Sequence, residues 1–200
     1  REVKSAIHDI IISSPALAGK YNGKDKFKML RDQITCNLTE NDYFPLNYST
    51  SRLDGKLPNV FLVDEAGALP NPYAIEAMAS GQLTILNKLG FIISTKYPTI
   101  QNPFEDECDY AKRVLDGMVE DDSEFSLLYE PDNKKDWASD DGILEQSNPL
   151  ALEVPEIMDD LKKKRQQAIE VQSKRENFIT KHCNIIYQGM GTESYISVAD

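Results

Sequence analysis

The feature that most constrains this chain is an apolar segment, Val60 to Val63, that runs directly into two adjacent carboxylates, Asp64 and Glu65. Four consecutive apolar residues favour a strand that is buried on both faces of a parallel sheet. The two carboxylates would then project from the carboxyl end of that strand. Open α/β sheets bind their ligands at this edge, so function is sought first at Asp64 and Glu65.

A helix and a second strand are predicted to follow. Asn71-Pro72 is a typical helix start, and the next residues favour a helix that ends near Lys88, where Gly90 could act as its cap. Residues 91–95 then read as a second buried strand. The sequence therefore predicts a β-α-β unit with two parallel strands.

The second predicted strand also ends in small polar residues, Ser94 and Thr95. Because the carboxyl ends of parallel strands meet at one edge of a sheet, both hydroxyls are expected on the same edge as Asp64 and Glu65. Hydroxyls at this position could sense the state of a bound nucleotide. Ordinary turn capping, for which Ser and Thr are also favoured, remains the alternative.

The flanking segments are less informative. We expect a helix over residues 1–12 and one or two short strands within 34–44. A further helix, from Asn102 to about Met118, has Glu105 in the position of a capping box. Beyond it we expect a strand over 123–129, an acidic loop over 132–148 around the core residue Trp137, and a long helix from Pro155 that could reach Cys183.

Charge and cysteine content narrow the classes of protein to which the chain could belong, but they exclude few of them. The net charge is −11, yet residues 105–145 hold fifteen acidic and four basic side chains, so the other residues carry eighteen of each sign. A DNA-binding face elsewhere is therefore not excluded. The three cysteines and two histidines lack zinc-ligand spacing, and no segment has the about 18 apolar residues of a membrane span. The run 162–165 could contact DNA, although a solvated helix face is the simpler interpretation.

Adjacent Asp and Glu residues after an apolar strand have a defined use in nucleotide hydrolysis. The Asp can hold Mg²⁺ through water, and the Glu can orient and deprotonate the attacking water. A strand that ends in a solvated turn is the simpler alternative for Asp64 and Glu65. Arg52, on a polar loop before the strand, could act as an arginine finger or be an ordinary exposed loop residue.

Several segments together resemble the large terminase subunit of tailed bacteriophages, in the order of that family and from about residue 45 onward. The last two are the most specific, because a generic ATPase has no reason to carry them. The segments are residues 60–65, Gly90 to Thr95, Phe125 to Glu130, Ser147-Asn148-Pro149, and Glu176 to Ile185.

This resemblance implies an α/β fold with a partial P-loop NTPase-like parallel sheet and a mostly helical lid subdomain. It implies an ATPase core portion over 1–101, the lid over 102–188 and the start of a connection to a nuclease domain over 189–200. Asp64 would be the magnesium-associated Walker B aspartate and Glu65 the catalytic base. Ser94 and Thr95 would form the coupling motif.

The resemblance also implies ATP and Mg²⁺ as cofactors and a role in packaging double-stranded DNA into a procapsid. The expected partners are the portal protein, the small terminase subunit and further copies of the chain, in the cytoplasm of a bacterial host that carries a phage or prophage. No membrane association is expected.

The sequence departs from the family in one important respect. No G-x-x-x-x-G-K-[ST] loop occurs in the 200 residues, so the strand and loop that grip the phosphates are expected outside them, as are the nuclease aspartates. A chain that starts at Arg1 without Met is expected to be a piece of a longer protein, inactive alone. Two alternatives stay open: a binding or scaffold module with a degenerate NTPase fold, and a nuclease using Asp64 and Glu65 as metal ligands.

Overall fold

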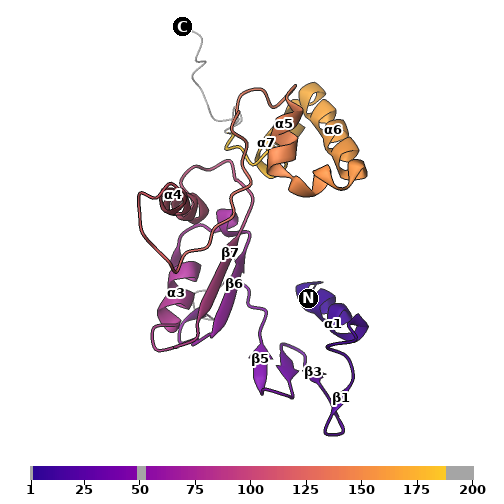
Figure 1. The fold of residues 1–200 in the computed structure, drawn as a ribbon, viewed down its shortest axis with the longest axis vertical. Coiled ribbons are helices and arrows are strands. Elements are labelled where there is room, and N and C mark those ends of the chain that lie inside the picture. Colours follow the sequence, from indigo (N-terminus) through magenta and orange to yellow (C-terminus); the bar gives the residue numbers. More distant parts are fainter. Residues whose placement is uncertain (1, 49–52, 188–200) are drawn as a thin grey trace. The chain divides into compact units, whose positions relative to one another are not determined.

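The computed structural model describes residues 2–48 and 53–187, and the chain divides into two compact units, Arg1–Gly55 and Lys56–Asp200 (Figure 1). In the described part no helix is both long and apolar enough to cross a membrane. The unit boundary at Gly55 was not predicted. The predicted divisions at residues 101 and 188 stay predictions.

The first unit contains one helix and five short strands. Helix α1 spans Glu2–Ser13, as predicted, and stops just before Pro15. The strands β1 (Lys20–Tyr21) and β2 (Lys24–Asp25) form a hairpin. A three-stranded antiparallel sheet follows in the order β3-β4-β5, built from Phe27–Met29, Ile34–Cys36 and Asn41–Tyr43. The short strands expected within 34–44 are therefore confirmed.

The second unit begins with the predicted β-α-β unit. Strand β6 (Val60–Asp64) pairs in parallel with β7 (Leu89–Ile93), and helix α3 (Tyr73–Gly81) connects them. The register pairs Val60 with Leu89 and Asp64 with Ile93. Both strands therefore end at the same edge, where Ser94 and Thr95 follow β7.

Two details of this unit differ from the prediction. Helix α3 ends at Gly81 rather than near Lys88, because the buried amide of Gln82 instead donates to the carbonyls of Asn59 and Leu89 and so ties the helix end to both strands. Gly90 is not a helix cap but part of β7, where a Cβ atom would meet the ring of Phe61 on the neighbouring strand. Glycine at this position lets the aromatic ring lie across the strand.

The expectation that the apolar strands are buried on both faces is wrong for the described residues. Val60 and Leu62 are each 59% exposed, and their register partners Leu89 and Phe91 are also exposed. Alternating residues such as Phe61 and Val63 are half-buried, and Ala74, Ile75 and Met78 of α3 are buried. The reason is that the described sheet has two strands with α3 packed on one side, which leaves the other side uncovered.

Helix α4 spans Pro103–Leu115 and begins as the sequence predicts. The side chain of Asn102 accepts hydrogen bonds from the backbone N–H groups of Phe104 and Glu105 at 3.0 and 3.3 Å. The reciprocal half of the capping box does not form, because the Glu105 carboxylate is instead buried against Lys96 at 2.6 Å. The carboxylate pairs with the opposite charge of Lys96, which is a stronger partner than a backbone N–H. The backbone N–H of Asn102, which a capping box would use, donates elsewhere.

The segment after α4 contains no strand among the described residues, so the strand predicted over 123–129 is wrong. Its residues alternate between exposed and half-buried from Phe125 to Glu130, as an extended chain does when one side lies against the protein. Among the described residues, this segment has no hydrogen-bonded neighbour that would make it a strand. Alternation along the chain is therefore weaker evidence for a strand than pairing with a neighbouring strand.

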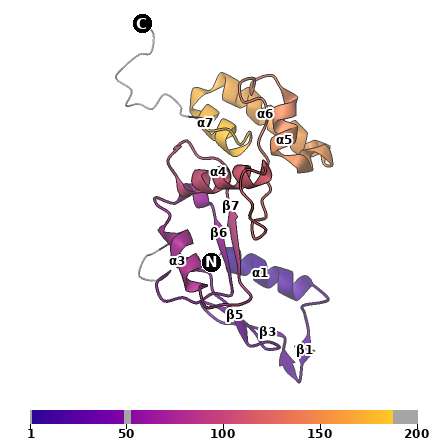
Figure 2. The same ribbon diagram turned by 60° about the vertical axis from the view of Figure 1, so that its left-hand side comes forward.

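The rest of the unit is a helical cluster, formed by α5 (Asp141–Ser147), a 3₁₀ turn at Pro149–Leu152, α6 (Pro155–Glu170) and α7 (Gln172–Lys181) (Figure 2). The acidic loop predicted over 132–148 is partly wrong, because Asp140 caps α5 there. The long helix predicted from Pro155 is broken at Val171, whose backbone is extended at φ −119° and ψ 104°.

The helical cluster closes its own core. Leu144, Ile143 and Ile179 are almost fully buried, and Trp137 packs against them from outside, as expected of a core anchor. The buried set draws on all four elements, so each helix contributes one apolar side. Its members are Ile143, Leu144, Ala151, Leu161, Ala168, Phe178, Ile179, Cys183 and Ile185.

Candidate functional site

Asp64 and Glu65 stand at the carboxyl end of β6, where the sequence places them. Asp64 is the last residue of the strand and its side chain is exposed. Glu65 has left-handed backbone angles, φ 56° and ψ 42°, and precedes a short 3₁₀ turn, η1, at Ala66–Ala68. A non-glycine residue in this region carries strain of about 1 to 3 kcal/mol, and such strain concentrates at functional sites.

The Glu65 carboxylate has two partners from distant parts of the chain. The Tyr97 hydroxyl donates a hydrogen bond to Oε2, and the Lys181 ammonium lies 3.3 Å from the same oxygen. The hydrogen bond from Tyr97, followed by the contact with Lys181, lowers the pKa of Glu65 below its ordinary value. The carboxylate is therefore held in its ionised form.

Ser94 joins the end of β7 to the turn that follows Glu65. Its hydroxyl accepts a hydrogen bond from the backbone N–H of Gly67 at 3.0 Å and donates to the carbonyl of Thr95 at 2.9 Å. The Thr95 hydroxyl is buried and forms no hydrogen bond with the described residues. A buried hydroxyl with unused hydrogen-bonding capacity, two residues after β7, is compatible with a sensing role.

Two residues at this site were missed by the sequence analysis. Tyr97 lies two positions after Thr95, in the segment that follows β7, and Lys181 ends α7 in the helical cluster. A Cβ atom at Gly67 would clash with the Tyr97 ring, so glycine allows the ring to lie against η1. Lys181 falls inside a segment that carried the terminase resemblance, which was the only sequence signal for it.

Three segments that carried the resemblance meet next to Lys181. Within the helical cluster, the Ser147 hydroxyl donates to the carbonyl of Cys183 and the Asn148 amide to that of His182, both at 2.7 Å. The Asn184 amide donates to the carbonyl of Tyr129 at 2.9 Å. These bonds fix the chain just after α7 and so determine where the helix end presents Lys181.

Other sequence candidates are not brought to this site. Arg52 lies outside the described residues, so the arginine-finger hypothesis stays a prediction. In the run 162–165, Lys162 and Arg165 both contact the carboxylate of Asp141, at 2.7 and 2.5 Å. This pairing favours the interpretation of the run as a packed helix face rather than a DNA contact.

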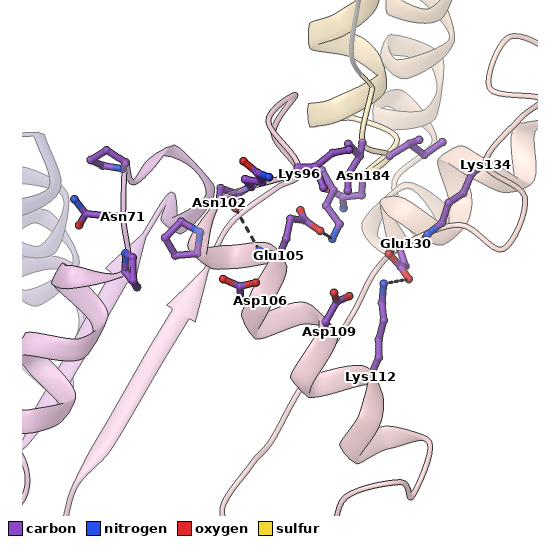
Figure 3. A pocket seen from close by; sticks show the side chains of 17 residues that line it. Asn71, Lys96, Asn102, Glu105, Asp106, Asp109, Lys112, Glu130, Lys134 and Asn184 are labelled. Atoms are coloured by element: carbon purple, nitrogen blue, oxygen red, sulfur yellow. Dashed lines mark hydrogen bonds and ion pairs between the residues drawn. The ribbon is translucent and has the colours of Figure 1, made fainter.

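A cavity of about 750 Å³ lies alongside α4, from Asn102 to Lys112, but is lined by none of Asp64, Glu65, Ser94 or Thr95 (Figure 3). Its walls carry charges of both signs that largely pair with each other: Lys96 with Glu105, and Lys112 and Lys134 with Glu130.

Magnesium can be tested against the residues present. In the described part of the chain no group of three His, Cys, Asp or Glu side chains could hold a metal ion. Mg²⁺ does not need one, since it typically binds through one or two carboxylates together with substrate phosphates and water. The exposed carboxylate of Asp64 fits that requirement, whereas the donor set of a metal-dependent nuclease is lacking there.

Comparison with known proteins places this geometry in a known fold. The model superimposes on the crystal structure of the HK97 bacteriophage large terminase with a TM-score of 0.69, over 92% of this chain and 37% of that one, at 19% sequence identity. The chain has the fold of a large terminase segment. The α/β fold that the sequence resemblance implied is thereby confirmed.

The sequence comparison gives a second protein to which the chain is similar. Protein YmfN of Escherichia coli (strain K12) is 29% identical over 132 residues, which cover 66% of this chain and 29% of YmfN. No family model matches. The chain thus spans well under half the length of both proteins to which it is similar.

Proposed function

We propose that this chain supplies the water-activating side of a terminase-type ATPase that packages double-stranded DNA into a viral procapsid. One observation carries the proposal: in a terminase fold, Asp64 and Glu65 stand at the carboxyl end of a parallel strand whose neighbour is followed by Ser94 and Thr95. This is the edge at which open α/β sheets bind ligands.

Each residue has a distinct role in this proposal. Asp64 would hold the magnesium ion of Mg-ATP through water, and the bound ion would supply neutralisation of phosphate charge. Glu65 accepts the proton of the attacking water and orients it. Ser94, hydrogen-bonded to Gly67, and Thr95 couple the state of the site to the end of β7.

The remaining roles follow from the resemblance. The phosphate-binding loop belongs to another part of the protein, and a nuclease domain cuts the packaged DNA. The motor acts as a ring of copies on the portal, with the small terminase subunit, in the cytoplasm of a bacterium carrying a phage or prophage. Arg52 is the candidate arginine finger toward a neighbouring copy.

The first test is ATP turnover by the full-length natural protein that contains this chain. Glu65→Gln removes the base without changing the size of the side chain, so turnover is expected to fall at least about 100-fold. Glu76→Gln, an exposed substitution of the same kind on α3, is the matched control and should leave turnover unchanged.

Two results would contradict the proposal. Turnover retained by Glu65→Gln would remove Glu65 from its role as base. Absence of ATP turnover in the unmodified full-length protein, under conditions where it binds DNA or a protein partner, would instead favour a binding module with a degenerate NTPase fold.

A further inference from the structure

Lys181 and Tyr97 are the feature of the site that the proposed roles leave unexplained. Lys181 is separated from Glu65 by 116 positions in the sequence, yet its ammonium reaches Oε2 of Glu65. The same ammonium lies 3.3 Å from the centre of the Tyr97 ring, while the Tyr97 hydroxyl bonds Oε2 itself. The three side chains therefore form a closed triangle.

Each member of this triangle is held by its own surroundings. Tyr97 lies against Gly67, where any side chain would clash with its ring. Lys181 is only 26% exposed and ends α7, a position where a positive charge is favoured by the helix dipole. The bonds of Ser147, Asn148 and Asn184 to the chain around it anchor that helix end.

Glu65, by contrast, would be poorly fixed without these partners. Its side chain is 57% exposed and has three rotatable bonds, so an unpartnered carboxylate would sample many orientations. Both donors act on one oxygen, Oε2. Charge-assisted hydrogen bonds of this kind are strong and directional, and they leave Oε1 as the oxygen available to water.

We infer that Lys181 of the helical cluster and Tyr97 are positioning residues for Glu65: they hold Oε2 so that Oε1 faces the attacking water. The inference rests on the proposed ATPase function and adds two residues to its site. A catalytic carboxylate must be held within about 0.5 Å of its productive position. Because Lys181 belongs to the helical cluster, the inference also gives that cluster a role in hydrolysis. The cluster delivers one of the two groups that hold the carboxylate.

The test uses steady-state ATP hydrolysis by the full-length natural protein. Lys181→Met and Tyr97→Phe each keep the bulk of the side chain but remove one donor, and kcat is expected to fall about 10- to 100-fold with KM changed less than about twofold. Lys181→Arg keeps a cationic donor and should recover most of kcat. Lys174→Met, at another lysine of α7 whose ammonium bonds the side chain of Gln167, is the control.

Two further measurements separate positioning from a general loss of structure. Affinity for a fluorescent ATP analogue should be the same in Lys181→Met and the unmodified protein. In a Glu65→Gln background Lys181→Met should cause no additional loss of turnover, because its effect passes through Glu65.

The outcomes distinguish the two proposals. If Glu65→Gln abolishes turnover while Lys181→Met and Tyr97→Phe keep normal or increased kcat, the positioning inference is overturned and the ATPase proposal stands. Equal kcat losses in Lys181→Arg and Lys181→Met, or an additive loss in the Glu65→Gln background, also overturn it. Turnover retained by Glu65→Gln overturns both.

Discussion

The helical cluster and the β6-β7 sheet solve the problem of burying apolar side chains differently. In the cluster, four short elements turn one apolar side each toward a common core, and Leu144 is fully buried. In the sheet, α3 covers one face and the other exposes Val60, Leu62 and Phe91. The cluster therefore buries its apolar side chains among the described residues, whereas the sheet that carries Asp64 and Glu65 has one apolar face that those residues leave uncovered.

The largest expected contrast is in stability. Leu144→Ala creates a cavity in a closed core and should lower the free energy of unfolding by about 2 to 5 kcal/mol. Leu62→Ala, the same change on the exposed sheet face at 59% exposure, should cost less than about 1 kcal/mol in the same protein. Urea unfolding followed by circular dichroism measures both. Equal losses of unfolding free energy in the two variants would contradict the contrast between a closed core and an exposed sheet face.

Thiol reactivity gives a second contrast, with an expected rate ratio of at least about 100-fold. Burial in the cluster raises the pKa of Cys183 to about 12, so its thiolate is scarce at neutral pH. Cys36 of the first unit is partly exposed, and the hydrogen bond from the Thr39 side chain lowers its pKa. Cys36 should therefore react first with a disulfide reagent on the native protein. Labelling of Cys183 at a similar rate would mean that the cluster opens readily.

The smallest expected effect is a pH dependence of the cluster. Burial, followed by the nearby charge of Lys164, lowers the pKa of His182 in the folded state, against an opposing effect of Asp160. The unfolded chain then binds the proton more readily, so stability is present above about pH 6.5 and declines as the pH falls below it. For this partly exposed ring the loss should not exceed about 0.5 kcal/mol. His182→Gln should remove it; an unchanged decline in that variant would assign it to other groups.

Predictions from the sequence succeeded where the determinants are local. The Asn102 cap, the parallel β-α-β unit and the carboxylates at its edge each depend on residues close together in the chain, and each is found in the structure. The resemblance segments also identified the fold, because the side chains of Ser147 and Asn148 donate to backbone carbonyls within segment 176–185.

Predictions from the sequence failed where the local structure depends on a contact with another part of the chain. The extended segment 123–129 alternates like a strand but lacks a neighbouring strand in the described chain, and the pairing of Glu105 with Lys96 replaces half of a capping box. The link between Glu65 and Lys181 spans 116 positions, and no periodicity or spacing can reveal such a contact. Tertiary contacts of this kind are visible only once the chain is folded.

The central claim is that Asp64 and Glu65 divide the work between holding Mg-ATP and activating water. Calorimetric titration of the full-length natural protein with Mg-ATP tests it most directly, using Asp64→Asn and Glu65→Gln side by side. Asp64→Asn is expected to weaken binding of Mg-ATP at least about 10-fold, whereas Glu65→Gln should bind like the unmodified protein and fail only in turnover. Normal Mg-ATP binding by Asp64→Asn, or equally weak binding by both variants, would contradict it.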